Sequence, residues 1–378
     1  MGPEDGEKTW YKRGARLNPA GRFATDTYEE IHEDRPPEEE VPGKPKRIGT
    51  RFYKDRTEKI IADNNSPDVP FDISVNPYRG CEHGCIYCYA RPGHEFLGFS
   101  AGLDFETKIM VKEQAPALLR RAINRPGWQV RPIAFSGVTD CYQPAERRFR
   151  LTRACLEVLA EHRHPTSVIT KNSLILRDLD ILRDMAARNL VSVAISVTSL
   201  DDDLCRVMEP RTSLPEARLE TIRRLREAGV PVSIMLSPLI PGINDREIPA
   251  LLRAGRDAGA TGARYILLRL PLTVRDLFRD WLETHFPLRA AAVMNHLTAM
   301  GQTDQAGNNF GRRMTGHGPL AGVIAAQFRV HSRRNGFVDT DRELRTDLFR
   351  PTVGRYDQPL LFPDHEAAAT GKSPPGAP

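Results

Sequence analysis

The sequence predicts an α/β fold, arranged as a partial (β/α)6 barrel, and two observations support this. From Asp72 onward, six short apolar runs alternate with longer amphipathic segments; the runs cover residues 73–78, 132–138, 165–171, 190–198, 230–237 and 263–270. The runs are continuous and rich in β-branched residues, which suits strands buried on both faces of a parallel sheet. A doubly wound sheet would give the same alternation, so the pattern alone fixes α/β and leaves the strand order open.

The segments between the runs have the spacing of helices that bury one face. Apolar residues recur three and four positions apart, as in Leu219, Ile222 and Leu225. Gly229 and Pro231 then mark the end of that helix and the start of the next strand. Residues 271–300 predict one or two further helices that cover the open side of the barrel.

Composition limits the class of protein. The chain has 378 residues, with 54 basic and 49 acidic side chains and a net charge of +5. This excess permits nucleic-acid binding but does not argue for it. Since no apolar run reaches the length of a membrane span or follows a basic start, we expect neither a signal peptide nor a membrane segment, and a cytoplasmic protein.

Four regions are expected along the chain. Residues 1–50 are rich in Glu, Pro, Arg and Lys and predict an extended or partly disordered arm, although the basic, turn-like residues 13–19 could instead lie across the barrel or touch a phosphate backbone. Residues 51–300 form the core barrel, residues 301–362 a basic, helical C-terminal extension, and residues 363–378 a disordered tail. The segment from Gln358 to Phe362 resembles the bacterial sliding-clamp-binding peptide, which implies the clamp as a partner.

Three cysteines directly follow the first predicted strand. Cys81, Cys85 and Cys88 lie within eight residues. Thiolates select zinc, copper(I) or iron–sulfur clusters, but three ligands are one too few for a closed zinc site or a complete ferredoxin pattern. The inference is a cluster with three irons held by these cysteines and a fourth iron left open. The alternative is a zinc site that uses His83 or His94 as the fourth ligand.

The CxxxCxxC spacing, with Tyr87 just before the last cysteine, resembles the signature of the radical S-adenosylmethionine (SAM) enzymes. The resemblance implies a TIM-like partial barrel, a [4Fe-4S] cluster and S-adenosyl-L-methionine bound to the open iron. It also implies an external one-electron reductant of the flavodoxin or ferredoxin type. In such enzymes the reduced cluster cleaves SAM to a 5′-deoxyadenosyl radical, while the protein orients and shields the reaction.

Candidate SAM-binding residues follow from the rule that reactive groups lie at the C-terminal ends of barrel strands. After the second strand, Gly137 gives room for close backbone approach, and Thr139 and Asp140 offer hydrogen bonds to an ammonium group or a ribose. Thr139 or Asp140 could instead cap the next helix. Lys171 ends the third strand, where the SAM carboxylate would compensate its charge; a surface lysine is the alternative.

The next two strand ends complete this set. Ser196 resembles the ribose-binding position of the superfamily, although a hydroxyl can equally satisfy local backbone groups. Ile240 and Gly242 match the apolar, glycine-containing loop that packs on adenine, and a plain turn before a helix cap is compatible with that role.

These residues, together with Tyr89, narrow the resemblance to the spore photoproduct lyase-like branch, often labelled DNA repair photolyase, over about residues 70–270. Spore photoproduct lyase has a hydrogen-donating cysteine upstream of the acidic residue in the second loop, where this chain has Gly137. The nearest thiol here is Cys141, which is either a hydrogen-atom donor or an inert, packed thiol. Tyr89 and Cys141 are the candidate catalytic residues.

The predicted function is radical SAM chemistry on an unidentified substrate, with DNA and photoproduct-lyase-like repair as a candidate. Two alternatives stay open from the sequence. One is a nucleic-acid-associated binding protein with a structural zinc site, and the other is a radical SAM enzyme that modifies RNA or protein. Loops rather than the barrel decide the substrate, because one fold hosts many chemistries.

Overall fold

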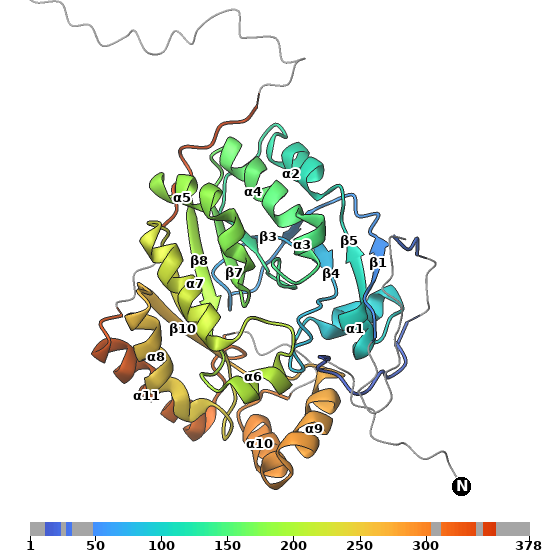
Figure 1. Ribbon diagram of the computed structural model, residues 1–378, viewed down its shortest axis with the longest axis vertical. Coiled ribbons are helices and arrows are strands. Elements are labelled where there is room, and N and C mark those ends of the chain that lie inside the picture. The colour runs from blue at the N-terminus through green and yellow to red at the C-terminus, as the bar shows by residue number, and fades with distance from the viewer. Residues whose placement is uncertain (1–11, 24–27, 32–47, 304–310, 338–342, 353–378) are drawn as a thin grey trace, which may run out of the picture.

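A seven-stranded sheet forms the centre of the molecule in the computed structural model, which describes residues 12–23, 28–31, 48–303, 311–337 and 343–352 (Figure 1). Its strand order is β10-β9-β8-β7-β6-β3-β2. The strands are β2 (Ile61–Asp63), β3 (Ile73–Val75), β6 (Ile133–Phe135), β7 (Thr166–Thr170), β8 (Val191–Ser196), β9 (Val232–Leu239) and β10 (Gly262–Leu267).

The order of the strands distinguishes the two α/β arrangements. Strands β3, β6, β7, β8, β9 and β10 are parallel and neighbour one another in chain order, and β2 pairs antiparallel with β3 at the edge. A doubly wound sheet would reverse its order at a switch point, whereas a barrel winds in one direction. Within the described residues β10 does not pair with β2 or β3, so the sheet does not close. The predicted partial barrel is therefore confirmed.

The first predicted strand is shorter in the structure than the apolar run of residues 73–78. β3 ends at Val75, and Tyr78–Arg79 form a separate strand, β4, in another sheet. The break falls at Asn76 and Pro77, because proline has no amide hydrogen to continue the ladder. The second sheet has the order β1-β5-β4, with β1 (Arg51–Lys54) and β5 (Lys108–Val111), and was not predicted.

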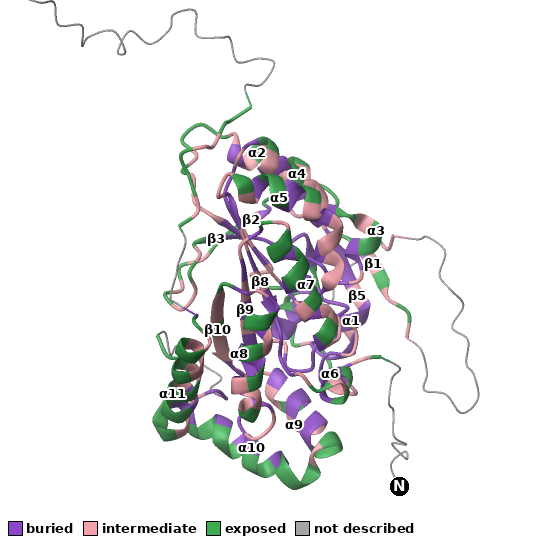
Figure 2. Ribbon diagram, turned by 60° about the vertical axis from the view of Figure 1, so that its left-hand side comes forward, coloured by how far each residue is buried: buried purple, intermediate pink, exposed green. Residues whose placement is uncertain are grey.

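Helices cover the outer side of the large sheet, and Figure 2 shows buried strands surrounded by helices whose outward faces are exposed. The longer helices are α2 (Ala115–Ile123), α4 (Leu151–Glu161), α5 (Leu179–Ala187), α7 (Pro215–Glu227), α8 (Ile248–Asp257), α9 (Val274–His285), α10 (Pro287–Ala299) and α11 (Gly318–Arg334). Shorter helical segments are η1 (Arg91–Leu97), α1 (Leu103–Thr107), α3 (Glu146–Phe149), η2 (Ser173–Asp178), α6 (Asp202–Met208) and η3 (Asp245–Glu247).

Helices α9 and α10 correspond to the two helices expected in residues 271–300. Phe278 and Trp281 of α9 belong to one buried cluster with Cys85, Ile86 and Tyr87. The helix pair therefore packs against the cysteine loop. No helix in the described ranges is long and apolar enough to span a bilayer. The clamp-like segment Gln358–Phe362 lies outside the described residues, so its role stays a prediction.

Two helical glycines differ in the space around them, which gives a test of core packing. A Cβ on Gly255 of α8 would lie 2.7 Å from Cδ1 and 2.8 Å from Cγ2 of the buried Ile234, whereas a Cβ on Gly322 of α11 would meet nothing within 4 Å. We expect Gly255→Ala to lower the free energy of unfolding by about 1–3 kcal/mol, because a β-branched core residue has little room to move. Urea unfolding followed by circular dichroism measures this.

The matched change Gly322→Ala should raise the free energy of unfolding by about 0.5–1 kcal/mol, because alanine costs less entropy in a helix. If both substitutions stabilised the protein equally, this result would contradict the close packing of α8 against β9.

Candidate active site at the cysteine loop

The three cysteines lie in a loop between β4 and η1. The loop is fixed at both ends by backbone hydrogen bonds, from Cys81 N to Phe105 O at 2.9 Å and from Ile86 N to Met208 O at 3.1 Å. Cys81 and Cys85 are buried, while Cys88 is half-buried. The loop thus presents its sulfurs inside the molecule, close to the C-terminal ends of the large sheet's strands.

The chemistry of the three thiols fits an iron–sulfur cluster. Burial raises the pKa of Cys81, Cys85 and Cys88, and the charges of Cys85 and Cys88 raise that of Cys81 further. Three sulfurs close enough to affect one another, in a site that disfavours free thiolates, need a cationic group to ionise together.

The two histidines offered for the zinc alternative are placed elsewhere. His83 is buried, with Nδ1 3.4 Å from Asp140 Oδ2 and Nε2 accepting a 3.0 Å hydrogen bond from Asn172. His94 is buried between the rings of Phe99 and Phe105, and burial lowers its pKa to about 4. Among the described residues, neither histidine forms a group of three His, Cys, Asp or Glu side chains around one position, and the three cysteines do not form one either, so the zinc alternative stays a prediction.

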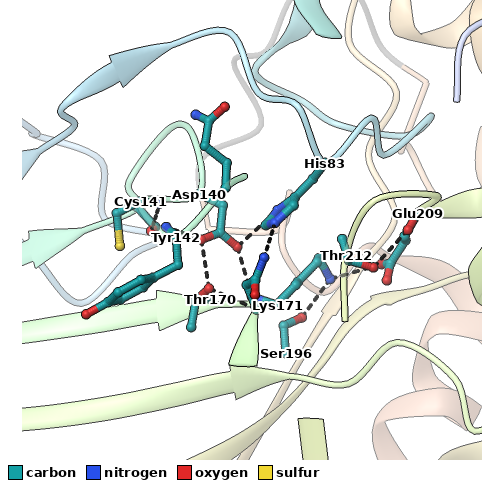
Figure 3. A network of polar contacts seen from close by, with 12 residues as sticks. His83, Asp140, Cys141, Tyr142, Thr170, Lys171, Ser196, Glu209 and Thr212 are labelled. Atoms are coloured by element: carbon teal, nitrogen blue, oxygen red, sulfur yellow. Dashed lines mark hydrogen bonds and ion pairs between the residues drawn. The ribbon is translucent and has the colours of Figure 1, made fainter. Parts of the chain in front are cut away.

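The His83 contacts connect the cysteine loop to two strand ends (Figure 3). Asp140 accepts hydrogen bonds from Thr170 Oγ1 at 2.7 Å and from Lys171 N at 2.8 Å. Burial alone would raise the pKa of Asp140, but His83 and these hydrogen bonds outweigh burial and lower it. The carboxylate proposed from sequence to face SAM is therefore already bound to protein groups, and it ties the loop after β6 to β7 and to the cysteine loop.

Thr139 and Gly137 complete the loop after β6. Thr139 Oγ1 donates to Tyr78 O at 2.9 Å, and Gly137 O accepts a 2.7 Å hydrogen bond from Tyr89 Oη. A Cβ on Gly137 would lie 3.0 Å from the Cβ of Ser74, so the backbone approaches β3 closely. The structure thus places Tyr89, which directly follows Cys88, beside the position where the resemblance expected a cysteine.

Lys171 directly follows β7 and lies in a group of polar contacts at the rim. Its Nζ lies 2.8 Å from Ser196 Oγ, 2.7 Å from Ser237 O and 3.1 Å from Glu209 Oε1. The ammonium also lies 5.7 Å from the ring centre of Tyr87. The structure therefore brings together the lysine and serine that the sequence assigned to SAM, and adds a carboxylate.

Glu209 is the functional residue that sequence reasoning missed. It is fully buried, pairs with both Lys171 and Arg218, and accepts hydrogen bonds from Thr198 and Tyr87. Burial would raise the pKa of Glu209, but Arg218 and Lys171 outweigh it and hold the carboxyl ionised. One sequence signal existed: Arg218 lies four and seven positions before Ile222 and Leu225, on the apolar face of its helix.

The loop after β9 packs against the cysteine loop. Ile240 is fully buried in one cluster with Cys85 and Tyr87, and its amide donates to Asn244 Oδ1 at 2.6 Å. Gly242 has φ +81°, a left-handed conformation that favours glycine. Thus Ile240 and Gly242 lie at the same rim as Lys171 and Ser196, and their SAM-binding roles stay predictions.

Cys141 does not face this rim. The residue is fully buried within the main hydrophobic core, and burial raises the pKa of its thiol well above the usual value. In Figure 3 its sulfur points away from Lys171 and His83. The structure therefore buries the thiol of Cys141, and its role as a hydrogen-atom donor stays a prediction.

Arg91 holds the cysteine loop through hydrogen bonds to its backbone carbonyls. It is fully buried and donates to Cys85 O at 2.8 Å, to Ala101 O at 3.0 Å and to Glu106 Oε1 at 2.6 Å. Since Glu106 is also fully buried, the pair forms a desolvated ion pair whose remaining hydrogen bonds go to loop carbonyls. The loop conformation and this ion pair therefore depend on each other.

Part of the predicted arm lies against the same ion pair. Gly14 N and Ala15 N donate to the two Glu106 oxygens at 3.0 and 2.8 Å, and Arg13 Nη1 donates to Glu106 O at 2.9 Å. Gly14 and Ala15 are buried. Residues 13–15, which we call the N-terminal strap, therefore lie against the cysteine loop, and the expectation for the rest of residues 1–50 stays a prediction.

Comparison with known proteins now identifies the class. Residues 75–254 match the model of the Radical SAM superfamily, and this part of the chain belongs to that superfamily. Its members use a [4Fe-4S] cluster and S-adenosyl-L-methionine, and they need a reductant. The cysteine loop and its buried thiols are the part of this chain that fits the cluster. The resemblance predicted from the sequence is confirmed.

Two relatives at the level of sequence carry the name uncharacterized protein. One from Mycobacterium tuberculosis is 39% identical over 225 residues, which cover 59% of this chain and 66% of that protein, just under two thirds. One from Methanocaldococcus jannaschii is 26% identical over 262 residues, covering 69% of this chain and 94% of the relative.

A solved structure of spore photoproduct lyase, complexed with dinucleoside spore photoproduct, shares the fold with a TM-score of 0.52 and 14% identity. The match covers 77% of this chain and 79% of that one.

The strap gives a test with a matched control. A Cβ on Gly14 would lie 1.8 Å from Gly84 O, in the cysteine loop, whereas a Cβ on Gly49 would meet nothing within 4 Å. Gly14→Ala should displace the strap, and we expect faster trypsin cleavage after Arg16, followed by mass spectrometry. Gly49→Ala should leave that rate unchanged, and equal rates in both variants would contradict the placement.

Glu209 gives a prediction with a pH dependence. Glu209→Gln leaves Arg218 buried without its carboxylate, so we expect about 3–5 kcal/mol lower free energy of unfolding at pH 7. A carboxyl with a lowered pKa stabilises the fold above its ordinary pKa of 4.5, and this stability is lost as the pH falls below that value. The difference between wild type and variant should therefore shrink in acid.

Urea unfolding at a series of pH values measures this difference. The control is Glu220→Gln, which removes an exposed carboxylate paired with exposed Arg223 and should cost less than about 1 kcal/mol. A Glu209→Gln protein as stable as wild type at pH 7 would show that the buried charge group is not assembled as described.

Proposed function

We propose that this protein is a radical SAM enzyme that reductively cleaves S-adenosyl-L-methionine and acts on a nucleic acid, with DNA repair of the photoproduct lyase type as the leading case. The observation that carries the proposal is the cysteine loop, in which Cys85 and Cys88 lie close enough to Lys171 for its charge to lower their pKa, at the rim of a partial barrel. The fold shared with spore photoproduct lyase supports a nucleic-acid substrate.

Cys81, Cys85 and Cys88 would hold three irons of the cluster. When bound, the cluster and SAM together supply a 5′-deoxyadenosyl radical that abstracts a hydrogen atom from the substrate. The role of the chain is orientation and exclusion of water. Ile240 and Trp281 close the apolar side of the loop, because both share a buried cluster with Cys85.

Lys171 would bind the SAM carboxylate. Its ammonium is held at the rim by Ser196, Ser237 and Glu209, so its position is fixed before a ligand arrives. Ser196 Oγ, beside this ammonium, would meet the ribose. Asp140 would position the cysteine loop and would not bind SAM directly, because its carboxylate contacts His83 and the backbone amide of Lys171.

The electron would come from a flavodoxin- or ferredoxin-type protein. A cluster held by thiolates requires a reducing compartment, and we place the activity in the cytoplasm. RNA or protein modification is the alternative substrate class, and the barrel itself does not separate it from DNA.

Anaerobic reconstitution with iron and sulfide tests the proposal. Wild type should become brown and release 5′-deoxyadenosine from SAM after chemical reduction, as measured by chromatography. Cys85→Ala removes a proposed ligand and should form neither the full chromophore nor the product. Cys155→Ala, a core thiol of α4 away from the loop, serves as the control and should behave as wild type.

Wild type that binds zinc and no iron, or a Cys85→Ala protein that still releases 5′-deoxyadenosine at the wild-type rate, would refute the assignment. Ultraviolet-irradiated spore-type DNA added to the same assay tests the repair case. If the photoproduct stayed unchanged while 5′-deoxyadenosine was still formed, the repair hypothesis would be refuted and the radical SAM activity would be retained.

A further inference from the structure

An arginine at the end of β10 lacks a polar partner. Arg269 lies two residues beyond the last residue of β10 and is half-buried. Within the described part of the chain it makes no hydrogen bond or ion pair, and its contact is the ring of Tyr89, whose centre lies 5.3 Å from the guanidinium carbon. Removing a guanidinium partly from water without a hydrogen-bond acceptor costs free energy, unless a bound anion supplies the acceptor.

A second guanidinium lies nearby. Arg313 pairs with Asp68 at 2.5 Å and donates to Ser66. Burial and the charge of Arg313 both lower the pKa of Arg269, so the two side chains are close enough to repel each other. Asp68 is thus one carboxylate between two guanidiniums, and it is already bound to Arg313. The local charge is positive at the side of the barrel mouth where Tyr89 lies.

Tyr89 offers a flat apolar surface beside this charge. Its side chain is 46% exposed, and its hydroxyl is fixed on Gly137 O at 2.7 Å, so the ring is held in one orientation. Val138, next to Gly137, is 48% exposed. An accessible aromatic ring next to a guanidinium is the combination that proteins use to stack a base and bind the adjoining phosphate of a single strand.

We propose that Arg269 binds a phosphodiester group of a nucleic-acid substrate whose base lies against Tyr89. The guanidinium fork matches a phosphate better than a single-point cation would. This inference rests on the proposed function and adds to it, because it defines an anion position separate from Lys171. Lys171 directly follows β7 and contacts Ser196 of β8 and Ser237 of β9. Arg269 follows β10 and contacts Tyr89.

The test is equilibrium binding by the reconstituted, full-length protein in the presence of SAM. The probes are a short fluorescein-labelled oligothymidylate and its methylphosphonate analogue, which has the same bases and no backbone charge. Wild type should bind the phosphodiester probe more tightly. Arg269→Gln should weaken that binding at least about tenfold and remove most of the difference in affinity between the two probes. It should also lower the slope of log Kobs against the logarithm of the salt concentration by about 0.7.

Arg269→Lys should recover part of the affinity, and Arg253→Gln, which removes an exposed arginine of α8, should change nothing. Equal affinity of wild type and Arg269→Gln for the phosphodiester probe would overturn the proposal. So would an equal loss of SAM affinity in Arg269→Gln, measured by equilibrium dialysis, because the guanidinium would then serve the cofactor. A phosphoserine peptide that binds through Arg269 in place of the oligonucleotide would also overturn it.

Failure of this inference is distinguishable from failure of the proposed function. Release of 5′-deoxyadenosine by wild type without Arg269-dependent probe binding would refute the phosphate site alone. Arg269-dependent binding of the phosphodiester probe by a protein that never cleaves SAM would refute the radical chemistry and support the site.

Discussion

The buried carboxylate of Glu209 is the constraint on which the rest of the site depends. It pairs with Arg218 from α7 and Lys171 from β7, and it accepts the hydroxyl of Tyr87 from the cysteine loop. Removing such a charge from water costs several kcal/mol, and only complete pairing offsets it. Every partner must therefore be in place at once. The same carboxylate positions the ends of two strands, one helix and the cysteine loop. The energetic cost of burying this charge is therefore accompanied by a fixed geometry of the site.

The cysteine loop is held a second time on its other side. Arg91 and Glu106 form another buried ion pair, whose free hydrogen-bonding groups are satisfied by carbonyls of the loop and by amides of the N-terminal strap. The strap lies outside residues 75–254, the part of the chain that matches the superfamily. The support of the cysteine loop therefore includes a segment outside the matched part of the chain. A loop held by two independent charge groups keeps its sulfurs in place even though the sheet around it is open at one edge.

Local pattern was enough to predict the strands and the loops at their ends, and it failed where distant segments meet. The six parallel strands, the cysteine loop, Lys171 and Ser196 each carry their signal within a few residues. The sheet of β1, β5 and β4 joins short strands far apart in sequence, so no single window reveals it. Arg218 lies on the apolar face of its helix, but its sequence position does not reveal Glu209 as its partner, because the fold alone buries the two together. The arm looked like a solvated segment because its burial depends on one carboxylate about ninety residues away.

The placement of the remaining thiols limits which residues can touch a substrate. Cys141, Cys155 and Cys205 are all buried, each with no more than 1% exposure. A thiol in a packed core cannot meet a bound molecule without opening that core, which would also separate Cys141 from the Ser136 hydroxyl that binds its amide. Tyr89, by contrast, is exposed, fixed by its hydroxyl, and adjacent to a cluster cysteine. At the position where the resemblance expects a cysteine, this chain has Gly137, and Tyr89, with Arg269 against its ring, lies beside it, so the proposed substrate contacts use an aromatic ring and a guanidinium instead of a thiol.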